Sequence, residues 1–379
     1  MPGETAAELD TLTLHDLHTL PVDVASLFEQ AELQDPQFGL AWYRNLATTV
    51  FGSHAGLCVH VLRRDGQAIA ALPVVASKAG LGRKVAALGN YYTSLFSPAL
   101  ACDVQPNELA LLVRQAVRAH SPLQSLRLAP MAPTAPGFDL MRTALAAAGL
   151  VPFDYFCFGN WYQPISGNAE QYLASRPGDL RSTLRRMGKK FTTAGGHFEI
   201  VSSPDQTADA AASFISVYSS SWKRPEPFAG FIPGLAHLCA QKGWLRLGLA
   251  KVDKQVVAAQ LWIVAAGKAN IYKLAYDPSF RHLSPGSLLT AQLMSHVIDV
   301  DKVQEIDYLT GDDAYKNQWM SHRRERRGLI AFNPRTLGGF AALLRETSAR
   351  RLKPLFQRRP GADEIATPLA HRSMHVAPG

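Results

Sequence analysis

One segment, residues 274–289, constrains the fold more than any other part of the chain. It reads Leu-Ala-Tyr-Asp-Pro-Ser-Phe-Arg-His-Leu-Ser-Pro-Gly-Ser-Leu-Leu. Residues 270–276 favour a β-strand, and Pro278 ends it because proline cannot donate to a ladder. Ser284 is a favourable N-cap, Pro285 suits the first helical position, and apolar residues follow at three-to-four spacing. The segment therefore predicts a strand joined to a buried helix that begins near Ser284.

The predicted turn also has the features of an anion-binding site. A helix start presents free backbone N–H groups and the positive end of the helix dipole. Gly286 would let an anion approach the main chain, and Arg281 adds a full positive charge. An ordinary strand–turn–helix with a Ser-Pro start explains the same residues equally well.

The spacing of Arg281, Ser284 and Gly286 resembles the acyl-CoA pyrophosphate loop of the GNAT acyltransferase superfamily. That pattern is Arg or Gln, two residues, Gly, one residue, then Gly or Ala. Here Ser284 replaces the first glycine and Pro285 removes one amide donor, so the loop offers one N–H fewer. The resemblance implies acetyl-CoA or another acyl-CoA as co-substrate and no metal. The residues that it assigns to the cofactor are Tyr276, Arg281, His282, Leu283, Ser284, Gly286 and Ser287.

A second motif follows a short predicted strand at residues 303–309. It reads Gly-Asp-Asp-Ala-Tyr-Lys-Asn-Gln-Trp over residues 311–319. The two motifs in this order resemble the CelD-type branch of GNAT proteins, linked to bacterial exopolysaccharide and cellulose biosynthesis. That branch is similar to the FemABX peptidyl transferases, which carry two GNAT-like halves. The resemblance is clearest over residues 170–335 and weaker over residues 37–165.

The chain length and the order of predicted elements agree with two halves. A chain of 379 residues is long for a single core. Both halves read as strand, two helices, hairpin, strand and helix. We therefore expect an α/β (α+β) fold of two tandem GNAT-like domains, each a mixed, mostly antiparallel sheet flanked by helices. The predicted parts are residues 1–165, residues 166–335 with the cofactor loop, and a C-terminal part, residues 336–379.

The first half lacks a comparable loop. At the corresponding place, residues 91–98 read Tyr-Tyr-Thr-Ser-Leu-Phe-Ser-Pro, without the glycine or the arginine. We therefore expect the cofactor in the second half and the acceptor between the halves.

Positive charge concentrates in two segments. Residues 323–359 hold eleven Lys or Arg and two Glu. The net charge of this segment, +9, exceeds the net charge of +8 for the whole chain. This stretch could meet an anionic ligand, nucleic acid or lipid, or it could be a solvated tail. A second basic stretch, residues 176–191, predicts a helix that faces a phosphate-bearing ligand or simply links the halves.

Catalytic candidates come from the second motif and the strand before it. In GNAT proteins a tyrosine commonly protonates the departing thiolate, and Tyr315 stands in a comparable region; packing against Trp319 is the alternative. Lys316 resembles the motif lysine, unless it is a solvent-exposed lysine. Asp307 could accept the proton of the amine if burial raised its pKa. We expect Trp222, Phe228 and Trp319 at the acceptor pocket, with core packing as the competing account.

Composition limits the setting of the protein. No run of about 18 apolar residues and no signal-peptide pattern occurs, so we expect a bacterial, cytoplasmic protein. Four isolated cysteines, without the CxxC pairs of a zinc site, are expected to be reduced and buried. Residues 335–359 predict a basic amphipathic helix that docks on the protein or lies on anionic lipid. Residues 361–379 are expected to be disordered.

These features predict an acyl-CoA-dependent N-acyltransferase that moves an acyl group, with acetyl the first expectation, to an amino sugar or other small amine. A Fem-like aminoacyltransferase that uses charged tRNA is a close alternative, which the basic segments would suit. A non-catalytic scaffold in an exopolysaccharide assembly is a third. Outside the tRNA alternative we expect no nucleic-acid partner, and the sequence leaves the oligomeric state open.

Overall fold

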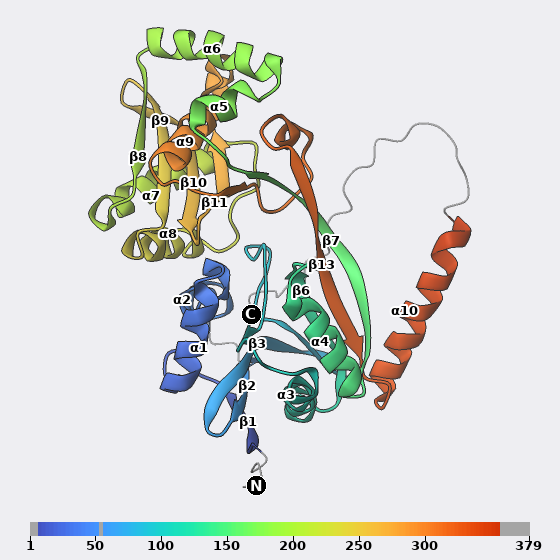
Figure 1. The fold of residues 1–379 in the computed structure, drawn as a ribbon. Coiled ribbons are helices and arrows are strands. Elements are labelled where there is room, and N and C mark those ends of the chain that lie inside the picture. The colour runs from blue at the N-terminus through green and yellow to red at the C-terminus, as the bar shows by residue number, and fades with distance from the viewer. Residues whose placement is uncertain (1–6, 53–55, 357–379) are drawn as a thin grey trace.

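The computed structural model describes residues 7–52 and 56–356. Figure 1 shows two α/β halves joined by a long two-stranded ribbon, β7 and β13. The first half comprises β1 (Leu9–Leu14), α1 (Val22–Glu32), η1 (Pro36–Phe38), α2 (Leu40–Leu46), η2 (Ala47–Phe51), β2 (Leu57–Arg64), β3 (Gln67–Ala79), β4 (Gly82–Ala87), β5 (Ala99–Leu100), α3 (Pro106–Ala119), β6 (Leu123–Met131), α4 (Pro136–Ala147) and β7 (Val151–Pro164).

The second half repeats this plan and ends in a long helix. It comprises α5 (Ala169–Ala174), α6 (Gly178–Thr193), β8 (Gly196–Val201), η3 (Pro204–Gln206), α7 (Thr207–Ser220), α8 (Phe231–Gln241), β9 (Leu245–Val252), β10 (Gln255–Ala265), β11 (Lys268–Tyr276), η4 (Pro278–Leu283), α9 (Pro285–Asp299), β12 (Glu305–Asp307), η5 (Ala314–Gln318), β13 (His322–Phe332) and α10 (Leu337–Phe356).

Local sequence explains several of these elements. The β2–β3 hairpin turns at Asp65 and Gly66, whose φ angles of 51° and 77° are both positive, as a two-residue Asp-Gly hairpin turn requires. Pro106 occupies the first turn of α3, and Glu108 closes a capping box with Gln105.

The strands of the two halves follow one another in mirrored order along the sheet, from β1 at one edge to β8 at the other. The order runs β1-β2-β3-β4-β6-β13-β7-β12-β11-β10-β9-β8, and β5 pairs with β3. The parallel pairs are β4 with β6 in the first half and β11 with β12 in the second, while the other neighbours are antiparallel. The expected tandem architecture with mostly antiparallel sheets is confirmed.

The last strand of each half serves both halves. β7 pairs with β13 through residues 151–162 and with β12 of the second half through residues 162–164. β13 in turn pairs with β6 of the first half. The two halves therefore exchange strands, which fixes how one sits relative to the other. Our division at residue 165 falls at the end of β7 and remains a proposal.

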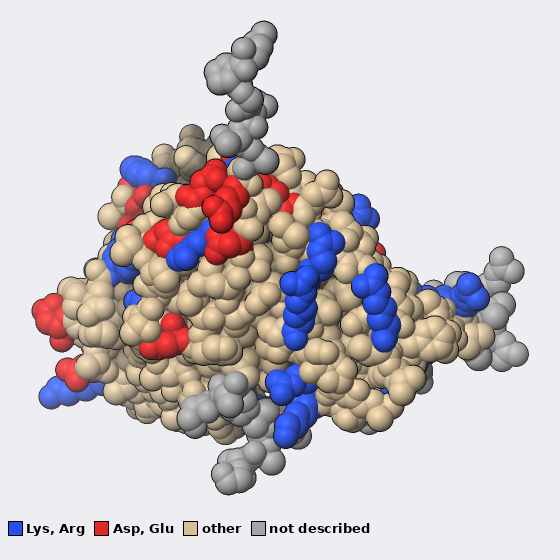
Figure 2. Space-filling model, turned by 90° about the horizontal axis from the view of Figure 1, so that it is seen from below, with Lys and Arg blue, Asp and Glu red and all other residues tan. Residues whose placement is uncertain are grey.

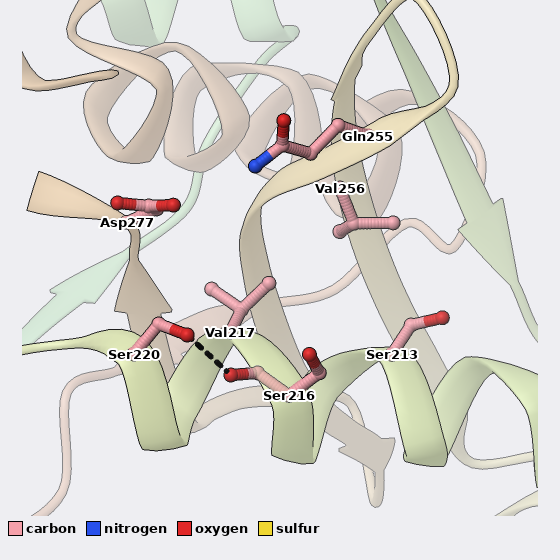
Figure 3. Close-up of a pocket in the computed structure, with 7 residues that line it drawn as sticks. All are labelled: Ser213, Ser216, Val217, Ser220, Gln255, Val256 and Asp277. Carbon is pink, nitrogen blue, oxygen red and sulfur yellow. Dashed lines mark hydrogen bonds between the residues drawn. The ribbon is translucent and has the colours of Figure 1, made fainter. Parts of the chain in front are cut away.

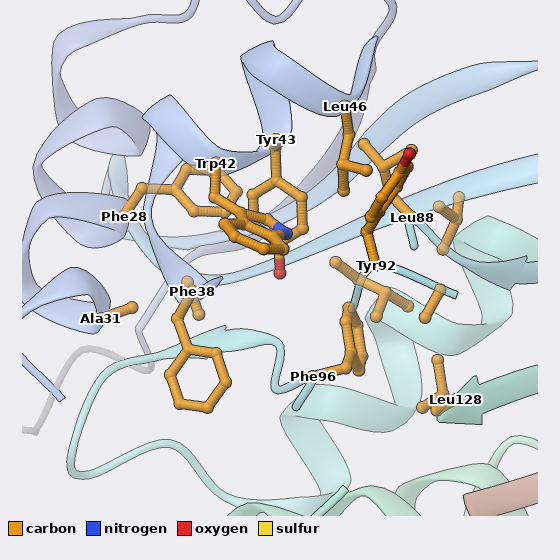
Figure 4. Close-up of a cluster of buried hydrophobic side chains, with 14 of the residues drawn as sticks. Phe28, Ala31, Phe38, Trp42, Tyr43, Leu46, Leu88, Tyr92, Phe96 and Leu128 are labelled. Carbon is orange, nitrogen blue, oxygen red and sulfur yellow. The ribbon is translucent and has the colours of Figure 1, made fainter. Parts of the chain in front are cut away.

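Two hydrophobic cores stabilise the molecule, and one of them crosses between the halves. The larger core includes Trp42 and Tyr92 of the first half together with Phe214 and Phe231 of the second. Figure 4 shows its first-half side, where Tyr92 and Phe96 from the 88–98 loop pack below α2. The smaller core lies beneath α9 on the other face of the second sheet.

The C-terminal helix α10 docks on the first half, as one alternative predicted. Its backbone accepts a hydrogen bond at Gly338 from Gln124, and Arg350 donates to the carbonyl oxygen of Asp154. Leu337, Phe340 and other apolar side chains of α10 remain exposed. The expectation for residues 361–379 lies outside the described residues. Within the described part of the chain, no helix is long and apolar enough to span a membrane.

Candidate active site in the second half

The predicted strand, turn and helix lie where the sequence indicated. β11 ends at Tyr276, and the carboxylate of Asp277 accepts a hydrogen bond from the N–H of Ser279 at 2.9 Å. The intervening turn forms the short 3-10 helix η4, and α9 then begins at Pro285. Arg281 and His282 are exposed on this turn, while Leu283 is buried in the smaller core.

Ser284 differs from the expected N-cap in its chemistry. It precedes α9 as predicted, but its side chain makes no capping hydrogen bond and its backbone is left-handed, with φ 51° and ψ 43°. Its N–H donates to the carbonyl oxygen of Arg281 at 3.1 Å, and Leu288 donates to Ser284. Since proline has no N–H, the backbone donors left at this helix start belong to Gly286 and Ser287.

Two aromatic rings border the turn. A Cβ atom on Gly286 would lie 3.3 Å from the ring of Tyr276, so glycine allows this ring to approach the helix start. The Tyr276 ring lies 4.7 Å from that of Trp222, which is 58% exposed. Tyr276, which the resemblance assigns to the cofactor, and Trp222, which we expect at the acceptor pocket, are thus neighbours.

The sheet opens directly before this turn. β12 pairs with β11 through residues 268–270, whereas β11 continues to Tyr276. The ammonium group of Lys223 donates a hydrogen bond to the carbonyl oxygen of Leu274, in the part of β11 beyond that pairing. The wedge between the fourth and fifth strands of this half is therefore lined by backbone and by a lysine that the sequence analysis did not single out.

A carboxylate at the junction of the halves links several groups that the sequence analysis missed. Glu226 forms an ion pair with Lys273 at 2.8 Å. It also accepts hydrogen bonds from the hydroxyl groups of Tyr91 and, at 2.7 Å, Tyr92. Burial alone would raise the pKa of Glu226, but the charge and hydrogen bond of Lys273 with those of the tyrosines hold it below its usual range.

The charges of Lys273 and Glu226 in this cluster act on Lys223. Burial, reinforced by the charge of Lys273, lowers the pKa of Lys223 to about 8. Its ammonium group is 5.5 Å from the centre of the Tyr218 ring. A lysine with such a pKa is partly neutral near physiological pH and can accept a proton.

The Tyr315 and Lys316 pair occupies two different environments. Tyr315 is 44% exposed, and its ring meets that of Tyr308 edge to face at 5.9 Å. Burial of the hydroxyl and the nearby Asp313 charge raise the pKa of Tyr315, which keeps the phenol protonated. Lys316 is 3% exposed, so it is not a solvent-exposed lysine. Its ammonium group donates to the carbonyl oxygen of Thr310 at 2.6 Å and pairs with Asp313 at 3.0 Å.

Asp307 lies in a buried network in the centre of the sheet. Its carboxylate accepts hydrogen bonds from Asn160, from the N–H of Leu309 and from Arg324. Arg326 lies 3.7 Å away. Both carboxylate oxygens are therefore engaged in holding β12, β7 and β13 together, and the assignment of Asp307 as proton acceptor remains a prediction.

The remaining acceptor candidates are further inside the protein. Trp319 is 3% exposed and belongs to the smaller core, and its carbonyl oxygen accepts hydrogen bonds from Tyr172 and Arg176. Phe228 is half-buried and its ring centre lies 6.3 Å from that of Tyr92. The structure thus brings Phe228 to the junction cluster and places Trp319 in the core.

Free positive charge gathers on α6 rather than on the arginine-rich β13. The β13 arginines are engaged with carboxylates, Arg323 with Asp312 and Arg327 with Asp154. The predicted basic helix exists as α6, but it lies at the end of the second half that is away from the first half (Figure 1). Lys190 of this helix donates to the carbonyl oxygen of His282 in the turn before α9. Within residues 7–52 and 56–356, no ion pair engages the exposed cations of α6, which are Arg181, Arg185, Arg186, Lys189 and Lys190.

The opposite end of the molecule differs. Figure 2 views the protein from the end away from α6, and its coloured Lys and Arg side chains are scattered among uncharged ones. Acidic side chains cluster there instead. This end therefore differs in charge from the exposed surface of α6, whose Lys190 contacts the turn before α9.

A small polar pocket lies on the α7 face of the second half. Figure 3 shows three serines of α7 on the side of the pocket opposite the start of β10 and Asp277, with the hydroxyl of Ser220 bonded to the carbonyl oxygen of Ser216. Its volume is about 210 Å³. Neither Arg281 nor Gly286 lines this pocket, so it is separate from the predicted diphosphate site. Its residues are Ser213, Ser216, Val217, Ser220, Gln255, Val256 and Asp277.

The cysteines only partly follow expectation. Cys58 and Cys239 are buried, as predicted, whereas Cys102 is exposed and Cys157 is intermediate. All four are free thiols.

Comparison with known proteins supports the assignment from geometry. Residues 178–317 match the family model of the acetyltransferase (GNAT) domain. The structure of FemX is similar over 88% of this chain and 99% of its own, with 12% sequence identity and a TM-score of 0.57, which concerns the fold. A tandem GNAT protein from the clavulanic acid biosynthesis pathway aligns over 85% of this chain and 98% of its own, with 14% identity and a TM-score of 0.46. No curated protein sequence is significantly similar to the chain.

The family model spans η4, α9 and β12, the elements that form the wedge and the turn. The strand exchange between two α/β halves agrees with the similarity to FemX over nearly the whole chain. Residues 178–317 are thus similar to the acetyltransferase (GNAT) domain, and the fold of the whole chain is similar to that of FemX.

Proposed function

We propose that the protein is an acyl-CoA-dependent N-acyltransferase of the bacterial cytoplasm. It moves an acyl group, with acetyl the first expectation, to the amine of a small molecule or amino sugar bound between the halves. The observation that carries this proposal is the wedge between β11 and β12, which opens directly before the turn that bears Arg281.

The residues at the turn fit a diphosphate. Arg281 is exposed, and the N–H groups of Gly286 and Ser287 remain as backbone donors at the positive end of α9. Lys190 brings a further charge from α6 to the same turn. The side-chain charges of Arg281 and Lys190 thus compensate for the backbone donor that Pro285 lacks.

The junction cluster supports handling of the acceptor. An amine must lose a proton to become a nucleophile, and Lys223, with a pKa near 8, can accept it. The carboxylate of Glu226 can hold the acceptor as an ammonium ion beforehand. Tyr315, which keeps its proton, can protonate the departing thiolate.

Calorimetric titration of the full chain with acetyl-CoA and with free CoA tests the cofactor assignment. Loss of the guanidinium in Arg281→Ala is expected to weaken binding about 10- to 100-fold, the range for a charged hydrogen bond. Arg142→Ala is the matched control, because Arg142 is equally exposed but lies on α4, paired with Asp139. Failure of the unaltered protein to bind either compound would exclude the proposal.

A second candidate, an aminoacyl-tRNA-dependent aminoacyltransferase, is favoured by one observation, the basic surface of α6. Its five exposed cations lie beside the turn and can meet an RNA backbone. Under this proposal the protein binds tRNA with an affinity that falls steeply with salt, and Arg185→Ala with Arg186→Ala weakens that binding. Salt-dependent tRNA binding without CoA binding would favour this candidate over the first.

A further inference from the structure

Three metal-ligating side chains meet inside the first half, far from the wedge. Cys58 and His60 lie two residues apart on β2, so both point to the same face of the sheet. His120 follows the last residue of α3. All three are buried, with 3%, 0% and 5% of their surface exposed.

The donor atoms form a compact triangle. The Nε2 atoms of His60 and His120 are 3.0 Å apart, and the Sγ atom of Cys58 is 3.6 Å from each of them. Tetrahedral zinc, with bonds of about 2.0–2.1 Å to nitrogen and 2.3 Å to sulfur, separates two nitrogens by roughly 3.3 Å and nitrogen from sulfur by roughly 3.6 Å. The observed triangle is close to one face of such a site.

One outer contact orients a ligand. Thr13 lies with its hydroxyl 2.9 Å from Nδ1 of His60, a contact of the kind that fixes the ring of a metal-binding histidine. Nδ1 of His120 is buried and makes no such hydrogen bond within the described residues. The Nε2 atoms of both rings face the thiol of Cys58.

A hydrogen bond between the two imidazoles explains part of this geometry. Such a hydrogen bond accounts for the 3.0 Å between the two Nε2 atoms. It does not explain why the Sγ atom of Cys58 lies at the same distance, 3.6 Å, from both of them. Convergence of two imidazoles and a thiol is the donor set that zinc and other borderline-soft divalent ions prefer.

We propose that Cys58, His60 and His120 bind one Zn²⁺ or a similar divalent transition-metal ion. A water molecule completes the fourth position. The ion clamps the end of α3 to β2. It has a structural role in the first half and does not depend on the proposed acyl transfer.

Metal analysis of the full chain, followed by titration of the metal-free protein with Zn²⁺ and Co²⁺, tests the site. We expect one ion per chain, and with Co²⁺ a thiolate charge-transfer absorption. Cys58→Ser should abolish that absorption and, like His120→Gln, weaken binding by at least about 100-fold, because even outer-contact changes cost about 10- to 100-fold. Thr13→Val removes only the outer contact to His60 and should weaken metal binding about 10- to 100-fold.

Cys239→Ser is the matched control, since Cys239 is equally buried but lies on α8 of the other half. It should bind metal like the unaltered protein. Variants that fail to fold do not decide the matter, because the unaltered chain provides its own test. If the folded, metal-free protein takes up neither ion, shows no charge-transfer band and gains no thermal stability from Zn²⁺, the proposal is wrong.

Discussion

Arg324 neutralises a carboxylate that water barely reaches. The side chain of Asp307 is 3% exposed, and its hydrogen bond from Arg324 joins β12 to β13. Removing one partner of a fully buried pair costs about 3–5 kcal/mol, and the 27% exposure of Arg324 reduces this to roughly 2–3 kcal/mol for Arg324→Ala. Chemical denaturation measures the loss. The adjacent Arg323→Ala, which breaks an exposed pair with Asp312, should cost less than about 1 kcal/mol, and equal losses would contradict this account.

Lys223 should titrate well below an ordinary lysine. Burial and the charge of Lys273 lower its pKa to about 8, so the folded protein releases this proton before the unfolded chain does. The group therefore opposes folding below pH 8, and its penalty fades as the pH rises from 8 toward 10.5. Amine labelling as a function of pH, read by peptide mass spectrometry, should give a midpoint near 8 for Lys223, against about 10.4 for a lysine in a model peptide. A midpoint above 10 for Lys223 would contradict this environment.

Sequence reasoning placed the local parts of the site but not the parts assembled by folding. Arg281 and Gly286 could be predicted because the turn is continuous in the chain. The cluster of Tyr91, Lys223 and Glu226 could not, because 135 residues separate the tyrosine from the carboxylate. The pair Cys58 and His60 carried a detectable signal, a Cys-x-His spacing in a strand, but its third member lies 60 residues beyond His60.

At the scale of elements, the packing of α9 on the sheet sets the position of the turn that bears Arg281. A Cβ atom on Gly248 of β9 would lie 2.8 Å from a methyl group of Leu293 and 3.0 Å from one of Leu289. Gly248→Ala should therefore push α9 outward and lower the free energy of unfolding by a net value of about 1–2 kcal/mol. This net value already includes the stabilisation expected when alanine replaces glycine inside a strand. Urea denaturation measures this change.

Gly178→Ala is the control for that substitution. Gly178 begins α6, and a Cβ atom there would meet nothing within 4 Å. Its replacement should leave stability unchanged or raise it by up to about 1 kcal/mol. A loss as large as that of Gly248→Ala would show that contact with α9 is not the cause.

The elements that sequence patterns missed are those whose stability depends on distant partners. The strand that ends at Tyr276 and the helix that begins beside Ser284 were predicted close to their observed bounds, because their patterns are local. β7 and β13 were not, since β13 begins His-Arg-Arg-Glu-Arg-Arg, which is typical of a solvated segment. Its arginines become compatible with a central strand because carboxylates from other parts of the chain neutralise them.

At the scale of the whole molecule, the two halves should unfold together. Phe231 of the second half is fully buried, stacks on Tyr92 at 3.8 Å and meets Trp42 edge to face at 5.6 Å. This shared core and the exchanged strands leave neither half complete without the other. Calorimetry should therefore show one transition with equal calorimetric and van't Hoff enthalpies. Two separated transitions in the unaltered protein would contradict this view.

Loss of the shared ring tests the same coupling by mutation. Phe231→Ala opens a cavity at the junction and should lower the stability of that single transition by about 3–5 kcal/mol. Phe340→Ala, which removes a ring of the same size that is 50% exposed on α10, should change it by less than about 0.5 kcal/mol. If Phe231→Ala instead destabilised the second half alone and left a native first half, detected by hydrogen exchange, the junction would not couple the two. A coupled junction would keep Glu226, which spans it, aligned with the wedge during turnover.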